Sequence, residues 1–359
     1  MPPRSITPGW RRLLSAEVLH SCLGRIETIE PENKLTTSAT PTSKKALSVF
    51  DTVARCVLVT GATGFVGQHL VRALLQDGHQ VIVLTRDVGR AATLFGGRVR
   101  AIAAMDDLPL DHQVDIVVNL AGARILGQRW TDARKATLRQ SRVALTEKVV
   151  DWIGRASHKP RLLLSASAIG YYGIQRIGDD AKLDEAAPPQ PMFMSDLCRE
   201  WEAAAAGAVR HGVQVECMRF GLVLGEQGAL PMMLLPIRLG IGGRLGSGRQ
   251  WLSWIHIDDL IGGIAHRWKQ ALKDASAPTF GATNFTAPIA VSQLEFSQAA
   301  ARVWKRPCVI PTPGWPMRLA LGEQADLLLE GQRVVPLRFA REGFEFTYPA
   351  LEAALRSLK

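Results

Sequence analysis

Short apolar runs alternate with amphipathic stretches along most of the chain. Residues 57–60, with the sequence VLVT, form a β-branched run that is typical of a buried parallel strand. The stretch that follows carries Leu70 and Leu74 at helical spacing and ends at Gly78, and residues 80–85 return to strand character. This order predicts a strand, a helix and a second strand in one unit.

The same alternation continues towards the C-terminus. Residues 114–125, 161–173 and 213–225 have the pattern of buried strands, and residues 195–212 have that of a helix between the last two. Strands and helices that alternate at this spacing favour an α/β fold with a doubly wound parallel sheet. A chain of 359 residues with 47% apolar content is also long enough for a smaller second domain.

The turn after the first strand holds three glycines at the spacing G-x-x-G-x-x-G. Such glycines let the backbone approach a pyrophosphate closely, and the helix start adds free N–H groups and the positive end of a dipole. Because strands precede and follow at the right distance, the sequence predicts a dinucleotide site; a tight turn without a ligand is the alternative. The predicted contacts in this turn are Gly61, Thr63, Gly64, Phe65, Val66 and Gly67.

The end of the second strand predicts which dinucleotide is bound. An Asp or Glu that binds the ribose is typical of NAD-binding proteins at this place, but the chain has Thr85 and Arg86 there. The Arg86 guanidinium can form a charge-assisted pair with a 2′-phosphate. We therefore expect NADP(H) rather than NAD(H), although an inward-pointing Asp87 would weaken this interpretation.

Two later strands end in residues that suit the cofactor crevice. Small residues at the carboxyl end of a strand leave room for a dinucleotide in an open parallel sheet. The additional predicted cofactor contacts are Leu120, Ala121, Gly122, Ser165 and Arg219.

Charge and cysteine content narrow the function classes. The net charge is +10, but the basic residues are dispersed and form no stripe interleaved with aromatics, so we expect no nucleic acid partner. Five scattered cysteines without a C-x-x-C motif argue against a disulfide framework and against a metal site. No apolar run is long enough for a transmembrane segment.

The first 50 residues have a different composition. Arg4, Arg11 and Arg12 precede the first acidic residue, Glu17, and residues 36–48 are rich in Ser and Thr. This segment resembles an organelle transit peptide followed by a linker, so we expect a plastid or mitochondrial location. A dispensable disordered tail is the alternative.

Several motifs together resemble one protein family. TGATGFVG, NLAGARI, SASAIGYYG, RFGLVLG and WIHIDD are similar to atypical extended short-chain dehydrogenases/reductases of the epimerase-family, nucleoside-diphosphate-sugar epimerase-like branch. The resemblance implies a Rossmann-type doubly wound sheet that binds NADP(H) and a smaller C-terminal α+β substrate domain. The implied division is a leader over 1–50, a Rossmann domain over 51–225 to which 255–285 return, and a substrate domain formed by 226–254 and 286–359.

The chain departs from this family at its acid/base pair. Active members have a Tyr, and a Lys four residues later, on the helix after the serine-bearing strand, where the Tyr exchanges a proton with the substrate. No Y-x-x-x-K occurs in the sequence. If Glu202 is aligned with the usual glutamate of that helix, Met194 and Cys198 occupy the two positions; a shift by one residue places Phe193 and Leu197 there.

Neighbouring side chains are the remaining catalytic candidates. Ser167 matches the family's serine, and Tyr171 or Tyr172 follows closely, with Arg176 as a cation partner for Tyr172. The alternative is that the tyrosines pack against the nicotinamide pocket and that Ser167 bonds the backbone or the cofactor.

Two residues outside that region are candidates for binding a substrate or an anion. His256 lies in WIHIDD, and Arg249 lies in the glycine-rich segment 242–251. A packed histidine and a solvated loop arginine are the alternatives.

Two functions remain open at this point. One is an NADP(H)-dependent oxidoreductase or epimerase that acts on a small anionic or sugar-like substrate. The other is a non-catalytic NADP(H)-holding subunit or assembly factor of an organellar complex, which docks through a surface such as residues 228–237.

Overall fold

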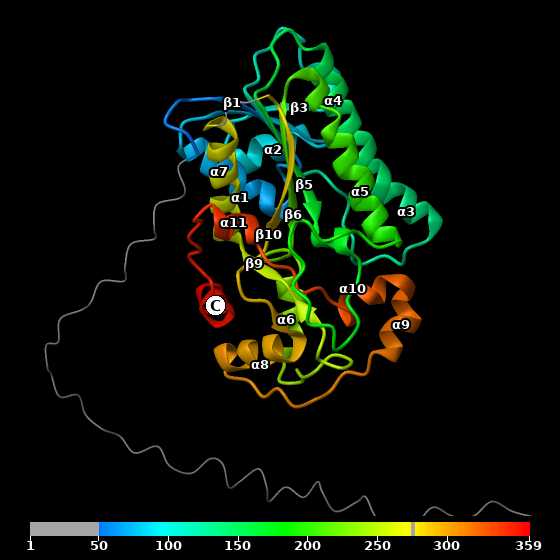
Figure 1. Cartoon of the computed structure of the whole chain (residues 1–359). Helices are drawn as coiled ribbons and strands as arrows, with labels where there is room; N and C mark the ends of the chain where they lie inside the picture. The colour runs from blue at the N-terminus through cyan, green and yellow to red at the C-terminus, as the bar shows by residue number, and fades with distance from the viewer. Residues whose placement is uncertain (1–49, 274–276) are drawn as a thin grey trace, which may run out of the picture. The chain divides into compact units, whose positions relative to one another are not determined.

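The predicted alternation of strands and helices is present in the computed structural model of the chain, which describes residues 50–273 and 277–359. Seven strands form one sheet in the order β10-β6-β5-β4-β1-β2-β3, and every neighbouring pair is parallel (Figure 1). The doubly wound α/β fold expected from the sequence is therefore confirmed. The strands are β1 (Cys56–Thr60), β2 (Gln80–Leu84), β3 (Arg100–Ile102), β4 (Ile116–Asn119), β5 (Leu162–Ala168), β6 (Gln214–Phe220) and β10 (Phe280–Phe285).

Helices cover both faces of this sheet, because the strands are apolar on both sides and must be buried on both. One apolar core joins the sheet to α1 (Phe65–Gln76), α2 (Val88–Phe95), α7 (Ile257–Lys273) and α11 (Leu337–Arg341). The helices on the other face are α3 (Asp132–Arg139), α4 (Leu145–Arg155) and α5 (Phe193–Ala206) (Figure 1). Short helical turns are η1 (Met105–Asp107), the π-helix η2 (Gln140–Ala144), η3 (Ile169–Tyr172) and η4 (Val209–His211).

The strand order reverses at β1, which lies between β2 and β4. Thr60, the last residue of β1, is in register with Leu84 of β2 and with Asn119 of β4. The helices that follow β2 and β4 lie on opposite faces, so the loops that leave these strands diverge at the carboxyl edge of the sheet. Ligands of doubly wound proteins bind at such a switch point.

The remaining elements build a smaller part beside that edge. It contains two two-stranded sheets, β7 (Leu222–Leu224) with β9 (Trp254–His256) and β8 (Trp251–Leu252) with β11 (Val291–Ser292). A separate apolar core unites α6 (Leu230–Arg238), α8 (Gln293–Trp304) and α12 (Leu351–Ser357). Further helices are α9 (Trp315–Leu321), η5 (Gly322–Ala325) and α10 (Asp326–Leu329).

The two parts exchange segments, so the domain boundaries drawn from the sequence stay a prediction. β10 is the seventh strand of the large sheet, and α7 packs in the core of that sheet. Phe339 on α11 is fully buried in the same core, although the sequence division assigns it to the smaller domain.

Several element boundaries differ from the predicted ones. The predicted strands over 114–125 and 161–173 end already at Asn119 and Ala168. Helix α5 begins at Phe193, two residues before the predicted start, and ends at Ala206; the Ser195 hydroxyl lies inside it and donates to the Tyr171 carbonyl at 2.5 Å. The predicted strand over 213–225 is divided into β6 and β7 at Gly221, where a Cβ would lie 2.5 Å from the Ser253 carbonyl oxygen.

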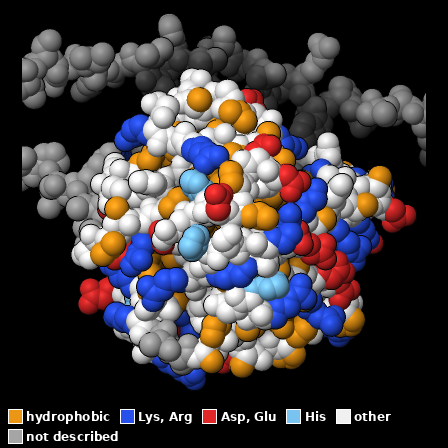
Figure 2. Space-filling view, turned by 90° about the horizontal axis from the view of Figure 1, so that it is seen from above, with side chains coloured by type: hydrophobic (Ala, Val, Ile, Leu, Met, Phe, Trp, Pro, Cys, Tyr) orange, Lys and Arg blue, Asp and Glu red, His pale blue; other side chains and the backbone are white. Residues whose placement is uncertain are grey.

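The surface of the described part mixes both signs of charge on the face seen in Figure 2, where basic, acidic and apolar side chains lie among one another. Within residues 50–273 and 277–359, no helix has the length and apolar character needed to span a membrane. The predicted transit segment lies outside the described residues, apart from Phe50.

Candidate functional site

The glycine turn brings the start of α1 against the end of β4. Gly61 has a φ of +68°, and a Cβ on it would lie 2.7 Å from the Leu120 carbonyl carbon. A Cβ on Gly67 would lie 2.3 Å from the Gly61 carbonyl oxygen. Glycine is therefore required at both positions by close backbone approach.

The start of α1 leaves backbone donors free. Its N-cap is Gly64, which has no side chain to accept from the first turn. The N–H groups of Phe65, Val66 and Gly67 consequently have no partner within the helix and lie at its positive end. This arrangement suits the pyrophosphate of a dinucleotide, as the sequence predicted.

The carboxyl group of Asp87 is engaged at the start of α2. Its Oδ1 accepts from the Arg90 backbone N–H at 2.9 Å and so caps α2. The Arg86 side chain is exposed at the end of β2. The inward-pointing carboxylate that would weaken the NADP(H) interpretation is thus not found here.

A buried hydrogen-bond network supports the β4 loop. The Thr60 hydroxyl donates to Asn119 Oδ1 at 2.6 Å and accepts from the Ala121 N–H at 3.1 Å. Asn119 Nδ2 donates to the Ser165 hydroxyl at 3.2 Å. Ser165 is fully buried below the loop, whereas Leu120 and Ala121 are half-buried and Gly122 is exposed, so these three can meet a ligand.

Ser167, near the end of β5, is part of a buried ion-pair network. Its hydroxyl donates to Glu202 Oε1 at 2.7 Å. The same carboxylate receives two bonds of 2.8 Å from Nε and Nη2 of Arg219. Arg219, predicted to contact the cofactor, therefore has two of its three nitrogens committed to Glu202.

Both tyrosines contact the Arg219 side chain. Arg219 Nη1 donates to the Tyr172 hydroxyl at 2.9 Å, and that hydroxyl donates to Asn284 Oδ1 at 2.6 Å. Burial raises the pKa of Tyr172 to about 12. The Tyr171 ring lies 3.5 Å from the Arg219 guanidinium carbon, and its hydroxyl forms no hydrogen bond with the described residues. The cation beside Tyr172 is thus Arg219 and not Arg176, which is exposed.

The comparisons with known proteins identify the family. Residues 57–275 match the NAD dependent epimerase/dehydratase family, and residues 312–358 match a domain of unknown function, DUF1731. The chain belongs to the NAD-dependent epimerase/dehydratase family. The resemblance stated from the motifs is thereby confirmed.

Named relatives cover most of the chain. The chloroplastic SDR39U1 homolog of Arabidopsis thaliana, an epimerase family protein, is 40% identical over 84% of this chain and 86% of its own length. The epimerase family protein YfhF of Bacillus subtilis is 37% identical over 84% of this chain and 97% of its own. The human epimerase family protein SDR39U1, crystallised with NADPH, is 33% identical with a TM-score of 0.73, covering 84% of this chain and 98% of that one.

The structure shows which side chains of α5 lie nearest to the end of β5. A Cβ on Gly170, just after β5, would lie 3.2 Å from Met194 Cε and 3.9 Å from Cys198 Sγ. Phe193 packs instead against Trp130. The positions that face the end of β5 are therefore Met194 and Cys198, and burial raises the pKa of the Cys198 thiol to about 12.

The two predicted substrate or anion residues lie in different surroundings. Arg249 is exposed on its loop. His256 is buried, with Nδ1 accepting from the Asp258 N–H at 3.1 Å, Nε2 lying 3.2 Å from the Ser357 hydroxyl and the Tyr348 ring at 4.0 Å. Burial lowers the pKa of His256 to about 4, so the ring is neutral and packed between α7 and α12.

Sequence reasoning missed the acceptors that organise the site. From the sequence, Glu202 is used only to align its helix with the family pattern and is given no function. Asn284, on the last strand of the sheet, is not among the predicted site residues. The one available signal was a glutamate four residues after Cys198 on the apolar side of a helix. Among the described residues, no cluster of His, Cys, Asp and Glu could hold a metal ion.

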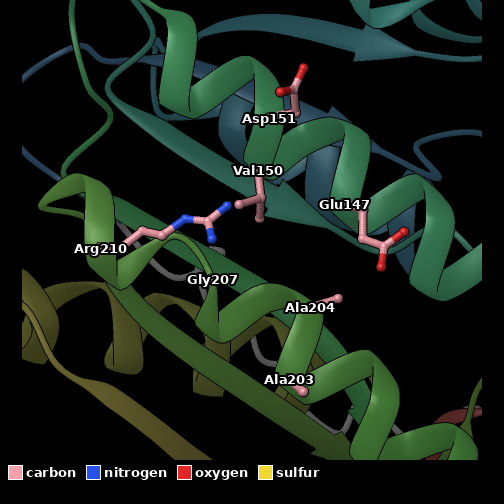
Figure 3. Close-up of a pocket in the computed structure, with 7 residues that line it drawn as sticks. All are labelled: Glu147, Val150, Asp151, Ala203, Ala204, Gly207 and Arg210. Carbon is pink, nitrogen blue, oxygen red and sulfur yellow. The ribbon is translucent and has the colours of Figure 1, made fainter.

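A surface groove between α4 and α5 lies away from this edge (Figure 3). It contains none of the residues that the sequence singled out. Its lining residues are Glu147, Val150, Asp151, Ala203, Ala204, Gly207 and Arg210.

Proposed function

We propose that the chain binds NADP(H) across the carboxyl edge of its large sheet. The observation that carries this proposal is the exposed Arg86 at the end of β2 beside an Asp87 whose carboxylate caps α2. The start of α1 would hold the pyrophosphate, and Leu120 to Gly122 would line the other side. The NADPH bound by the human relative supports the same choice.

Cofactor affinity tests this proposal. A phosphate-to-guanidinium hydrogen bond contributes about 1.5 to 3 kcal/mol, so Arg86→Ala should weaken NADPH about tenfold or more and leave NADH nearly unchanged. Arg98→Ala removes a cation just beyond the opposite end of α2 and serves as the control. Equal losses for NADPH and NADH in Arg86→Ala would show that Arg86 contacts no phosphate.

We further propose that any catalysis in the crevice uses Tyr171. The bound cofactor would supply or accept a hydride, as in an oxidoreductase or epimerase acting on a small anionic or sugar-like substrate. The hydroxyls of Ser167 and Tyr172 are held by Glu202, Arg219 and Asn284, whereas the Tyr171 hydroxyl is free of partners among the described residues. The exposed Arg249 remains the proposed anion contact, and His256 contributes only through packing.

A non-catalytic function is the second candidate, and one observation favours it. Met194 and Cys198 face the end of β5, and neither can deliver a proton there at neutral pH. General acid/base catalysis is typically worth 10²- to 10⁴-fold. In this alternative the cofactor stabilises a subunit or assembly factor that docks through residues 228–237, where Met232 and Leu235 are exposed.

Turnover separates the two candidates. We expect purified protein to bind NADPH without measurable oxidation by generic aldehydes, ketones or sugar nucleotides. If oxidation occurs, Tyr171→Phe should abolish it and Tyr172→Phe, which keeps the packing, should reduce it less. Activity that survives Tyr171→Phe would contradict the assignment of Tyr171.

A plastid or mitochondrial location is proposed on the composition of residues 1–50. The chloroplastic relative fits such a location, while the Bacillus relative belongs to an organism without organelles. A fusion of residues 1–50 to a fluorescent reporter should enter one of the two organelles. A reporter that stays in the cytosol would contradict the proposal.

A further inference from the structure

Three arginines are buried in the described part of the chain, and one of them lacks an acidic partner there. Arg219 pairs with Glu202, and Arg267 pairs with Glu216 and Glu342. Arg142, only 7% exposed, has no carboxylate within salt-bridge distance among the described residues.

The contacts of Arg142 are to neutral groups. Nη2 donates to the Ala123 carbonyl at 3.0 Å, while Nη1 lies 3.4 Å from both the Leu138 carbonyl and the Ser141 hydroxyl. Its guanidinium also lies 5.3 Å from the Trp201 ring. A buried charge without a counter-charge is costly, so a folded protein that retains one has a local cause for doing so.

The local backbone holds this side chain against the loop that follows β4. Arg142 belongs to the π-helix η2, and single π-turns of this kind occur frequently at functional sites. A Cβ on Gly122 would lie 2.9 Å from Arg142 Cζ, which places the guanidinium directly beside the exposed end of the β4 loop. Burial lowers the pKa of Arg142 to about 10, and the nearby Cys198 opposes that shift.

The direction of the cofactor follows from the proposed phosphate contact. If Arg86 at the end of β2 holds the 2′-phosphate, the adenine half lies over β2 and the nicotinamide half lies over β4 and β5. Arg142 is then on the nicotinamide side. It is also close to Cys198, one of the two positions at which the resemblance to the family places a lysine.

We propose that Arg142 provides the buried positive charge of the nicotinamide half, in place of the absent lysine, and that it makes the crevice bind NADPH more tightly than NADP⁺. The inference rests on the proposed NADP(H) binding. The oxidised nicotinamide ring carries a positive charge and the reduced ring is neutral, so Arg142 repels only the oxidised form. At an effective dielectric constant of about 20, two unit charges about 10 Å apart give a preference on the order of tenfold.

The test measures dissociation constants of both cofactor forms with the full chain. The variants are Arg142→Met, which removes the charge, and Arg142→Lys, which keeps it. Wild type should bind NADPH about tenfold more tightly than NADP⁺, Arg142→Met should bring the ratio close to one, and Arg142→Lys should preserve it. Arg139→Gln, which removes a half-exposed cation from the end of α3, should match the wild type.

Each result supports or overturns the inference. A wild type that binds both forms equally overturns it, and this holds even if Arg142→Met does not fold. Equal weakening of both forms in Arg142→Met also overturns it, because Arg142 would then only fix the loop at Ala123. If the wild type binds neither form, the proposed cofactor function fails and the inference fails with it. If Arg142→Met binds both forms with the same ratio of dissociation constants as the wild type, only the inference is refuted.

Discussion

Replacing Arg219 by Met tests whether the ion pair beneath the crevice is the structural centre of the site. The side chains of Arg219 and Glu202 are 5% and 6% exposed and joined by two hydrogen bonds of 2.8 Å. Met occupies a similar volume without the charge. In Arg219→Met the Glu202 carboxylate would keep only the Ser167 hydroxyl as a donor.

The expected loss follows from the burial of the carboxylate. Breaking a buried pair by removing one partner costs about 3 to 5 kcal/mol, because the remaining charge is left uncompensated. The lost contact between Arg219 and the Tyr171 ring adds about 0.5 to 2 kcal/mol. We therefore expect Arg219→Met to lower the free energy of unfolding by about 3.5 to 7 kcal/mol. The double variant Glu202→Gln/Arg219→Met should lose less than the sum of the single variants, with a coupling of about 2 kcal/mol.

Urea unfolding followed by tryptophan fluorescence measures these differences. Arg139→Met is the matched control because its pair with Glu200 is 43% and 41% exposed. An exposed pair contributes about 0 to 1 kcal/mol, so this control should stay close to the wild type. If Arg219→Met loses no more than Arg139→Met, the buried pair does not organise the site as we infer.

Two further predictions concern packing and pH. Gly67→Ala should lower the free energy of unfolding by about 1 to 3 kcal/mol and weaken NADPH binding, because the new Cβ would lie 2.3 Å from the Gly61 oxygen. Gly89→Ala is the control, since its new Cβ would lie 3.8 Å from the nearest atom, and it should be neutral or slightly stabilising. Thermal melts measure both variants. The unfolded His256 imidazole binds a proton near pH 6.5 but the folded one only near pH 4. The contribution of His256 to the free energy of unfolding should therefore be fully present above pH 6.5. It should fall by up to about 3 kcal/mol as the pH decreases to 4. His256→Asn should flatten this dependence in denaturant titrations, and an unchanged slope would contradict it.

The sheet and the nucleotide turn could be predicted because their causes are local in the sequence. The run 57–60 is nearly all of β1, and residues 80–85 contain β2. The glycine spacing follows from close backbone approach at Gly61 and Gly67, so it can be recognised without the rest of the fold. Arg86 lies two residues after β2, so its place near the strand end is equally local, while its contact with a phosphate stays a prediction.

The orientation of polar groups could not be predicted in this way. Asp87 follows Arg86 in the sequence, and only the start of α2 at Val88 determines that its carboxylate accepts from the N–H of Arg90, three residues later. The two registers for the missing Tyr and Lys are equally compatible with the sequence. The face that α5 turns towards Gly170 distinguishes them, and that face is set by packing between α5 and the sheet.

The network around Arg219 depends on residues that five different segments contribute. They are Ser167 from β5, Tyr172 from η3, Glu202 from α5, Arg219 from β6 and Asn284 from β10. Each alone has an ordinary explanation, as a strand serine or a solvated helix glutamate, and only the parallel order β10-β6-β5 brings them together. In this network the hydroxyls of Ser167 and Tyr172, which an acid/base mechanism would use, are already hydrogen-bonded to other side chains. Of the three candidate hydroxyls, Ser167, Tyr171 and Tyr172, the one on Tyr171 is therefore left without a hydrogen-bond partner among the described residues.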